Sequence, residues 1–390
     1  MSAPSAAVRP RLALVSALAA VVLVGTLSGA VHQAPRGVAG AAPDRVRDVP
    51  PPSASVEPTA PDRIDGSPAW PMLGAYTGPG AHGIAALREW ERWAGNTSGY
   101  GLDYAPAGSW ADITRPIWQL SAWSGARRRL IYSVPLFPNG PGVPDPGNLQ
   151  ECAAGRYDDQ WAALARNLVA YRLADTVVRP GWEFNGNWYA WASRGRESDY
   201  AGCFRHLVDA MRTVSGQRFA FLWNPAIGDD QSPAGPAYPG DAYVDCVGVD
   251  VYDMSWEPNT YPLPDGATPA QREQARRKVW NSRLDTAHGL RFWARFAAAH
   301  GKWLTIPEWG LSERTDGHGG GDDRYFVERM LEFIHDSANR VLFALYFEAN
   351  DQVGGLVTDA HVISAPDSRF PDAGNRFREI VGSGPGHPGE

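Results

Sequence analysis

The sequence predicts a (β/α)8 barrel, and three observations carry this prediction. Short apolar runs alternate with amphipathic helical segments along most of the chain. The runs are almost continuously apolar, as in parallel strands that are buried on both faces. Eight such strand and helix units occupy about 310 residues, which is within the size range of this barrel. The main alternative is an open, doubly wound sheet, but no glycine-rich phosphate loop follows the first apolar run.

The predicted strands are short runs of aliphatic and aromatic residues, which favour strands. In chain order they cover residues 72–77, 101–105, 130–137, 176–183, 219–224, 246–252, 303–308 and 342–348.

The predicted helices lie between these strands. Their apolar residues recur at i, i+3, i+4 and i+7, the spacing of a helix that buries one face. The clearest examples are residues 157–174, 199–214, 290–301 and 324–340. Gly301 ends the third of these segments, and glycine commonly ends a helix. No internal repeat is present.

The barrel domain is predicted to cover residues 69–384, followed by a flexible tail at 385–390. Residues 32–68 are rich in Pro, Ala and Ser. Such a composition cannot form a core, so we expect a disordered linker.

The first 31 residues are predicted to be an export segment. Arg9 and Arg11 precede an apolar run that starts at Leu12. Small residues at 28–30 are typical of a signal-peptidase site, whereas residues 12–31 are also about long enough to remain as a membrane anchor. Residues 1–31 are therefore a signal peptide or an anchor. In both cases the barrel is secreted or tethered outside the cytoplasm.

The net charge and the composition of the chain indicate which class of molecule it binds. The formal net charge is −7, and the basic residues are scattered. The basic patch expected of a nucleic-acid-binding protein is absent, so nucleic acid is excluded as a partner. Sixteen tryptophans are present, several of them beside Gly, Asn or Asp. Flat rings at a polar surface suggest sugar stacking and a polysaccharide partner.

The three cysteines allow one disulfide in an exported chain. No C-x-x-C spacing suggests a zinc site, and no metal is expected. Cys152 and Cys203 each lie at or near the start of a predicted helix, so we expect them to pair. Cys246 opens an apolar run and should be a buried thiol.

Polar residues end several predicted strands. In a barrel, residues at the carboxyl ends of the strands line the active site. These residues are Arg179 and Glu183 on the fourth strand, Trp223 and Asn224 on the fifth, Asp250 and Tyr252 on the sixth, Glu308 on the seventh, and Glu348 on the eighth.

Glu183 and Glu308 form the pair with the clearest chemistry. Strands four and seven are expected to face one another across the barrel, so the two carboxylates can flank a glycosidic bond, which requires one proton donor and one ionised carboxylate. Glu183 lies among Trp182, Phe184 and Trp188, where desolvation should keep it protonated. Glu308 has Arg179 and Tyr252 as expected neighbours, which should keep it ionised. Glu348 is a weaker candidate for the nucleophile.

Several neighbouring residues are candidates for contact with sugar. Trp188 and Trp191 suit a stacking platform, while Asn185 and Asn224 either bind sugar hydroxyls or serve only local turns. The remaining candidates are Arg179, Trp182, Trp223, Tyr252 and Trp309. The acidic loop 316–323 is interpreted as a lid or connector, with a metal clasp through His318 and Asp322 as the alternative.

Four ordered motifs carry a resemblance to a known family. They are "RPGWEFNGNWYAW", "FLWNP", "YPGDAYVDCVGVDVYD" and "IPEWG". In this order and at these separations they resemble glycoside hydrolase family 26, which includes β-mannanases, some β-glucanases and β-1,3-xylanases. The resemblance covers about residues 70–382. It implies a (β/α)8 barrel and retention of anomeric configuration. It also implies that Glu183 is the acid/base, Glu308 the nucleophile and Tyr252 the tyrosine that contacts the nucleophile.

One position departs from the family pattern. Family members commonly have His directly before the acid/base, where this chain has Trp182. The resemblance therefore does not assign mannan as the substrate. The expected function is an endo-acting, retaining glycosidase that cleaves a β-linked polysaccharide as a monomer and without a cofactor. The alternative is a catalytically silent, carbohydrate-binding barrel that assists polysaccharide assembly in the cell envelope.

Overall fold

The computed structural model describes residues 72–144, 146–228, 231–353 and 355–382. The predicted export segment 1–31, linker 32–68 and tail 385–390 lie outside these ranges. Within the described ranges, no helix has the length and apolarity that a membrane crossing requires.

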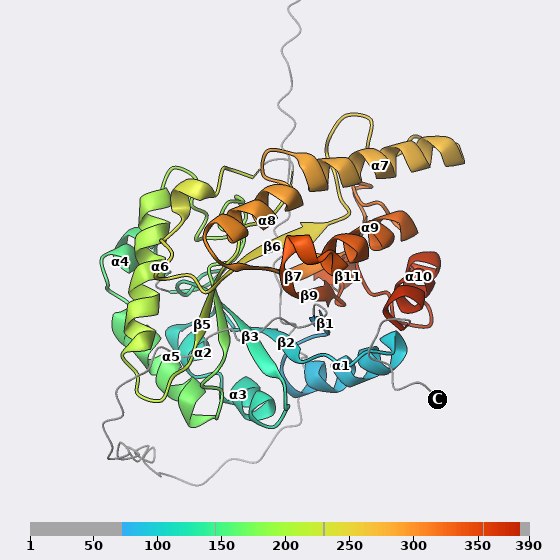
Figure 1. Cartoon of the computed structure of the whole chain (residues 1–390). Coiled ribbons are helices and arrows are strands. Elements are labelled where there is room, and N and C mark those ends of the chain that lie inside the picture. The colour runs from blue at the N-terminus through green and yellow to red at the C-terminus, as the bar shows by residue number, and fades with distance from the viewer. Residues whose placement is uncertain (1–71, 145, 229–230, 354, 383–390) are drawn as a thin grey trace, which may run out of the picture.

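Eight parallel strands form the barrel, with helices around the outside of the ring (Figure 1). The order around the sheet is β1-β9-β7-β6-β5-β4-β3-β2, and the two end strands β1 and β2 lie side by side. The predicted barrel class is therefore confirmed. The strands are β1 (Met72–Tyr76), β2 (Tyr100–Tyr104), β3 (Arg129–Val134), β4 (Val177–Pro180), β5 (Ala220–Trp223), β6 (Cys246–Tyr252), β7 (Trp303–Gly310) and β9 (Val341–Phe347).

The helices cover the barrel with apolar faces, as their spacing predicts. In α8 (Leu290–Ala299), for example, Leu290, Trp293 and Ala297 are the buried residues. Gly301, just beyond it, has φ +67°, a conformation that glycine adopts without strain. The other α-helices are α1 (Gly80–Ala94), α2 (Trp110–Thr114), α3 (Ile117–Ser124), α4 (Leu149–Ala153), α5 (Asp158–Ala170), α6 (Glu197–Arg212), α7 (Pro269–Asp285), α9 (Arg324–His335) and α10 (Pro371–Gly382), with short 3₁₀ turns at Gly235–Ala237 and Ser337–Asn339.

The fourth strand is shorter than the sequence predicts. It ends at Pro180, which has no N–H to extend the ladder. Gly181 and Glu183 then take left-handed conformations, with φ of 52° and 51°. Glu183 therefore lies on a turn beyond the strand, and this turn determines where its side chain points.

The seventh strand is irregular where it carries Glu308. Its register against β6 and β9 shifts around residues 304–309. Pro307 lies in this stretch and cannot donate to the ladder, which is the usual reason for a proline to occupy a bulge. Bulges near active sites commonly redirect a side chain, and here Glu308 pairs in register with Asp250 of β6.

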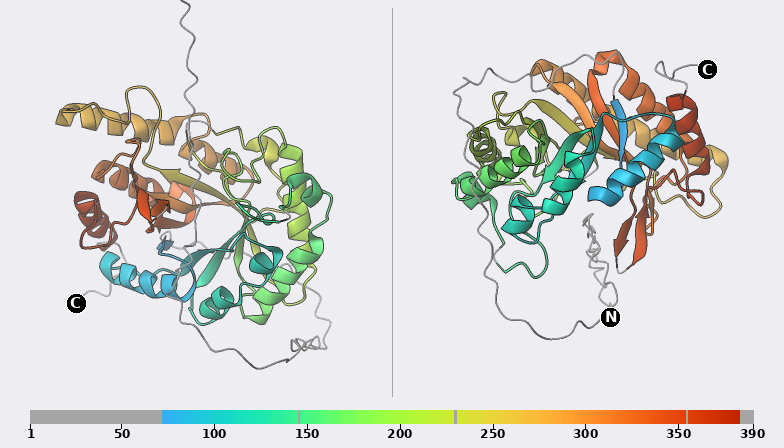
Figure 2. Two further views of the ribbon diagram at one scale, coloured as in Figure 1. Left: turned by 180° about the vertical axis from the view of Figure 1, so that it is seen from behind. Right: turned by 90° about the horizontal axis from the view of Figure 1, so that it is seen from below.

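A second, small sheet lies beside the barrel. It consists of β8 (Glu313–Arg314), β10 (Asp351–Val353) and β11 (Leu356–Ala360), in the order β10-β11-β8. Figure 2 shows the orange-red hairpin of this sheet projecting from the barrel. Because β8 follows β7 and β10 follows β9, the small sheet continues from the ends of two barrel strands.

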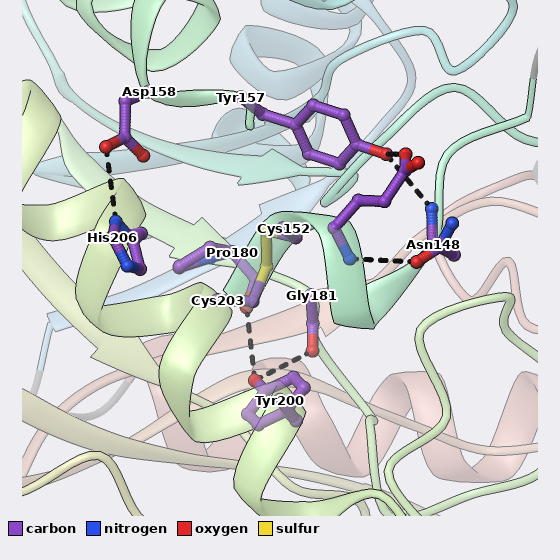
Figure 3. The surroundings of a disulfide bond; sticks show 10 residues. Asn148, Cys152, Tyr157, Asp158, Pro180, Gly181, Tyr200, Cys203 and His206 are labelled. Carbon is purple, nitrogen blue, oxygen red and sulfur yellow. Dashed lines mark hydrogen bonds and ion pairs between the residues drawn. A yellow bond between two sulfur atoms is a disulfide. The ribbon is translucent and has the colours of Figure 1, made fainter. Parts of the chain in front are cut away.

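A disulfide joins Cys152 of α4 to Cys203 of α6, the pair that the sequence favoured. Cys246 is a buried free thiol. Figure 3 shows Tyr200, one turn before Cys203, donating a hydrogen bond to the carbonyl of Gly181 at 3.0 Å. The disulfide therefore fixes the helix that supports the turn leading to Glu183.

Loss of this disulfide should lower stability. The cysteines are 51 residues apart, and cross-linking a chain over that separation stabilises the folded state by about 4 kcal/mol in the chain-entropy estimate. We expect the Cys152→Ser/Cys203→Ser double variant to have a clearly lower melting temperature than the wild type. Cys246→Ala is the control, because Cys246 is not part of the disulfide. Reductant should lower the melting temperature of this variant as much as it lowers that of the wild type. Equal melting temperatures for the double variant and the wild type would contradict the prediction.

Candidate active site

Arg179 of β4 connects the strands at the mouth of the barrel. Its side chain has no solvent exposure. One nitrogen pairs with Asp250 of β6, and another donates to Glu308 of β7 at 2.6 Å. The same guanidinium donates to Ser133 of β3 at 3.0 Å and to the Asn224 amide oxygen at 3.1 Å. Arg179 is thus a positioning residue, with no surface left for a ligand.

Glu308 is held by three donors. Its Oε1 accepts from Arg179 and from the Tyr104 hydroxyl, both at 2.6 Å, and its Oε2 accepts from the Tyr252 hydroxyl at 2.8 Å. Burial, followed by the charge of Glu308, raises the pKa of both phenols well above the usual range. The two tyrosines therefore stay protonated and donate. A cation and two phenols therefore fix the orientation of the Glu308 carboxyl group.

Trp182 covers this network. Its ring lies 5.6 Å from the Arg179 guanidinium and edge-on to Tyr104, with ring centroids 5.3 Å apart. Its N–H donates to the Tyr189 hydroxyl at 2.9 Å. Because Trp182 is only 5% exposed, it shields the charged network from water more than it offers a surface to a ligand.

Glu183 is placed by its backbone. Its left-handed φ is unusual for a residue other than glycine, and strained backbone of this kind is often found at functional sites. Its N–H donates to the Asn224 carbonyl at 2.7 Å, and its carbonyl accepts from Gly186 at 3.0 Å. These bonds fix the turn and leave the carboxyl group partly exposed.

The carboxyl of Glu183 has a different environment from that of Glu308. Its Oε2 accepts one hydrogen bond, from the Trp188 indole at 2.9 Å. That indole lies against Gly186, where a Cβ would come within 2.4 Å of the ring. Desolvation, followed by the charge of Glu308, raises the pKa of Glu183 to about 8. Glu183 is therefore protonated at neutral pH.

The two carboxyl groups come from strands three places apart in the barrel. β4 and β7 are separated by β5 and β6 on one side, so they are not diametrically opposed as the sequence analysis expected. The turn beyond Pro180 and the bulge in β7 bring the two groups near enough for the charge of Glu308 to act on Glu183.

Three tryptophans expected to contact sugar are in the core. Trp191, Trp223 and Trp309 are each 1% exposed or less. Trp191 donates to the Trp182 carbonyl and stacks on Tyr189. Trp223 packs among helix residues outside the barrel, and Trp309 packs on Phe377 of α10. The three rings pack beneath the carboxyl ends of the strands, and neither face of any ring is open to a sugar. Trp188, in contrast, remains partly exposed beside Glu183.

The two amide candidates have local roles. Asn185 exchanges two hydrogen bonds with the backbone of Ala226. Asn224 accepts from Arg179 and donates to Asp250. Both residues are at most 2% exposed. The sequence left open whether Asn185 and Asn224 bind sugar or serve local turns. Their contacts favour a local structural role.

Glu348 and two residues of the loop 316–323 also contact other parts of the protein. Glu348 accepts backbone hydrogen bonds from Ile363 and Ser364. Asp322 accepts from two N–H groups at the start of α10, and His318 stacks on Trp256. The described residues contain no group of three or more acidic, His or Cys side chains that could hold a metal. His318 and Asp322, the two residues suggested as a metal clasp, each bind other parts of the backbone.

Tyr104 was missed by the sequence analysis. It ends β2 in the run "GLDYA", which looked like an ordinary strand. A polar residue at a strand end was the available signal, but a tyrosine there is equally typical of a core.

Replacing Arg179 should destabilise the fold. Arg179→Met keeps much of the side-chain volume but leaves Asp250 and Glu308 without their cation. Removing one partner of a buried ion pair costs about 3–5 kcal/mol, so we expect a loss of this size in urea denaturation. Arg166→Met, on the exposed face of α5, is the matched control and should change stability by less than about 0.5 kcal/mol. Equal losses for the two variants would refute the assigned role of Arg179.

The chain is similar to known proteins in sequence. Residues 152–263 match Glycosyl hydrolase family 26. This match includes Glu183 and ends before Glu308. The chain is 28% identical over 249 residues to Endoglucanase H of Acetivibrio thermocellus, covering 62% of this chain and 24% of that protein. It is 33% identical over 109 residues to Mannan endo-1,4-beta-mannosidase of Bifidobacterium adolescentis, covering 26% of this chain and 11% of that protein. The chain thus spans a quarter or less of these relatives.

Solved structures share the fold. An endo-beta-1,4-mannanase of Cellulomonas fimi aligns with a TM-score of 0.54 at 18% identity, covering 81% of this chain and 71% of that one. The GH26 beta-mannanase of Bacteroides ovatus aligns with a TM-score of 0.51 at 16% identity, covering 81% and 89%. At these identities the likeness establishes the barrel. In sequence, the chain is thus similar to glycoside hydrolase family 26 across the turn of Glu183.

Proposed function

We propose that the chain is an endo-acting, retaining glycosidase that cleaves a β-linked polysaccharide. The observation that supports this proposal is the contrast between the surroundings of two carboxyl groups at one barrel mouth. Glu308 accepts hydrogen bonds from three donors, one of them a cation, while the pKa of Glu183 is raised to about 8. A double displacement requires this combination of a nucleophile and a proton donor.

In the first step, Glu308 attacks the anomeric carbon while Glu183 transfers its proton to the glycosidic oxygen. The carbon–oxygen bond to the leaving sugar breaks as the bond to Glu308 forms. Oε2 of Glu308 is the better attacking atom, because it accepts one hydrogen bond where Oε1 accepts two. Trp188 donates to Oε2 of Glu183, so Oε1 carries the transferred proton.

In the second step, ionised Glu183 removes a proton from water, and the water oxygen displaces Glu308 from the sugar. The anomeric configuration is retained and both residues return to their first state. The names of the relatives suggest β-1,4-linked glucan or mannan as substrates to test first. Because Trp182 stands where family members commonly have histidine, the sugar has to be identified by experiment.

We also propose that the domain works outside the cytoplasm as a monomer, either secreted or tethered by residues 1–31. The disulfide supports export, because such bonds persist in oxidising compartments. Fractionation of expressing cells, with and without residues 1–31, would test the location.

Glu308→Ala should remove turnover on a panel of mannans, glucans, xylans and arabinans. We expect a loss of at least about a thousandfold in kcat, because a covalent nucleophile has no substitute. Polysaccharide binding, measured by affinity electrophoresis, should persist. Glu348→Gln serves as a comparison, because Glu348 only accepts backbone bonds and the variant should retain turnover. Unchanged hydrolysis by Glu308→Ala would overturn the assignment. A wild type that binds but hydrolyses nothing would favour the catalytically silent barrel.

Glu183→Ala should affect substrates according to their leaving group. Polysaccharide hydrolysis should fall by about 10²–10⁴-fold, while activated aryl glycosides should lose far less because they need no proton. For the wild type, kcat/KM should decline as pH rises past about 8, where Glu183 loses its proton. This decline should be absent from the aryl-glycoside profile of Glu183→Ala. Equal losses on both substrates, or an unchanged decline at high pH, would exclude Glu183 as the proton donor.

A further inference from the structure

Asp351 lies near the active site, and its carboxylate has no partner among the residues that the structure describes. It opens β10, a few residues beyond the end of β9. In the sheet order, β9 is next to β7 and directly opposite β4. The strand that leads to Asp351 is therefore on the side of Glu308 away from β4, although the charge of Asp351 still acts on Glu183.

The neighbouring acceptors are all engaged. Glu348 accepts from two backbone N–H groups, and the Asn350 amide oxygen accepts from His361 and Val362. These bonds hold the connection between β9 and β10 in place. Among the described residues, the carboxylate of Asp351 forms no hydrogen bond or ion pair, although it is only partly exposed.

The nearby cations are committed elsewhere. Arg314 pairs with Asp316 and with Asp359. His361 lies 3.7 Å from Asp359 and interacts through Nδ1 with the Leu311 carbonyl. Desolvation raises the pKa of Asp351 to about 6, and the charge of Glu308 contributes to the rise. At neutral pH this carboxylate is ionised and available to a donor.

Tyr76 supplies a second unengaged group in the same place. It ends β1, and its ring packs on Phe347 and edge-on to Tyr104. Its hydroxyl has no partner among the described residues, yet it is not among the polar atoms sealed from solvent. Desolvation, together with the charges of Asp103, Glu308 and Asp351, raises the pKa of Tyr76 above its usual range, so the hydroxyl keeps its proton.

We propose that Asp351 and Tyr76 form a recognition pair for the hydroxyl groups of a neutral sugar in the glycone subsite. This inference rests on the proposed function. The leaving sugar departs toward the proton donor Glu183, so the sugar retained on Glu308 and those before it lie on the opposite side. There, the carboxylate accepts from a sugar hydroxyl while the phenol donates to another.

The same pair selects against acidic sugars. A uronic acid residue would bring its carboxylate to Asp351 and Glu308, and like charges in a partly desolvated site repel. The substrate class is therefore a neutral β-glycan such as a mannan, glucan or xylan, rather than a polyuronate.

Asp351→Asn and Tyr76→Phe test the pair. A hydrogen bond to a charged group contributes about 1.5–3 kcal/mol, so Asp351→Asn should raise KM on the hydrolysed neutral glycan at least about tenfold. We expect kcat to change less than about threefold, and Tyr76→Phe to raise KM about threefold to tenfold. Gln352→Ala is the control, because Gln352 follows Asp351 directly and its side chain is exposed. It should leave both constants unchanged.

Binding separates this inference from the proposed function. In the Glu308→Ala background, Asp351→Asn should weaken binding to glucomannan by a similar factor, and the parent variant should not retain polygalacturonate. A wild type that hydrolyses no glycan would refute the proposed function alone, because the binding comparison would still test the pair. Unchanged KM and unchanged binding in Asp351→Asn, or equal binding of glucomannan and polygalacturonate by the parent, would overturn the inference.

Discussion

The buried ion pairs of Arg179 are the interaction on which the site depends. A guanidinium without solvent contact is stable only when its charge is balanced and its donors are occupied, and here Asp250, Glu308, Ser133 and Asn224 meet these needs. These partners come from four different strands or their ends. One side chain therefore helps to orient Glu308, and it links the strands of the barrel to the site.

The rest of the site follows from how differently two glutamates are solvated. Glu308 faces a cation and two phenols inside the ring of strands. Glu183 stands on a strained turn outside its strand, with one indole as a donor. The disulfide and Tyr200 support that turn from the helix layer. The position of Glu183 thus depends on the whole β4 to α6 unit.

Much of the architecture could be predicted from the amino-acid sequence. Apolar runs separated by helical spacing predicted all eight barrel strands, because burial on both faces leaves a clear mark on composition. The two glutamates were predicted because polar residues at strand ends are conspicuous in apolar surroundings. Predictions for the tryptophans were much weaker. Trp188 and Trp191 are three residues apart in one motif, yet one lies at the rim and the other in the core.

Residue pattern was enough to predict the barrel, the order of its elements and the cysteines that join, and to select the pair of glutamates as candidates. Local pattern suffices for these features, because strand burial and residue type are properties of short segments. Only the tertiary structure decided that Tyr104 reaches Glu308 from a strand 204 residues earlier in the chain. It also decided that the Asn224 amide accepts from Arg179, and that no described residue pairs with the carboxylate of Asp351. These facts depend on distances across the ring, and such distances exist only once the strands have closed around their side chains.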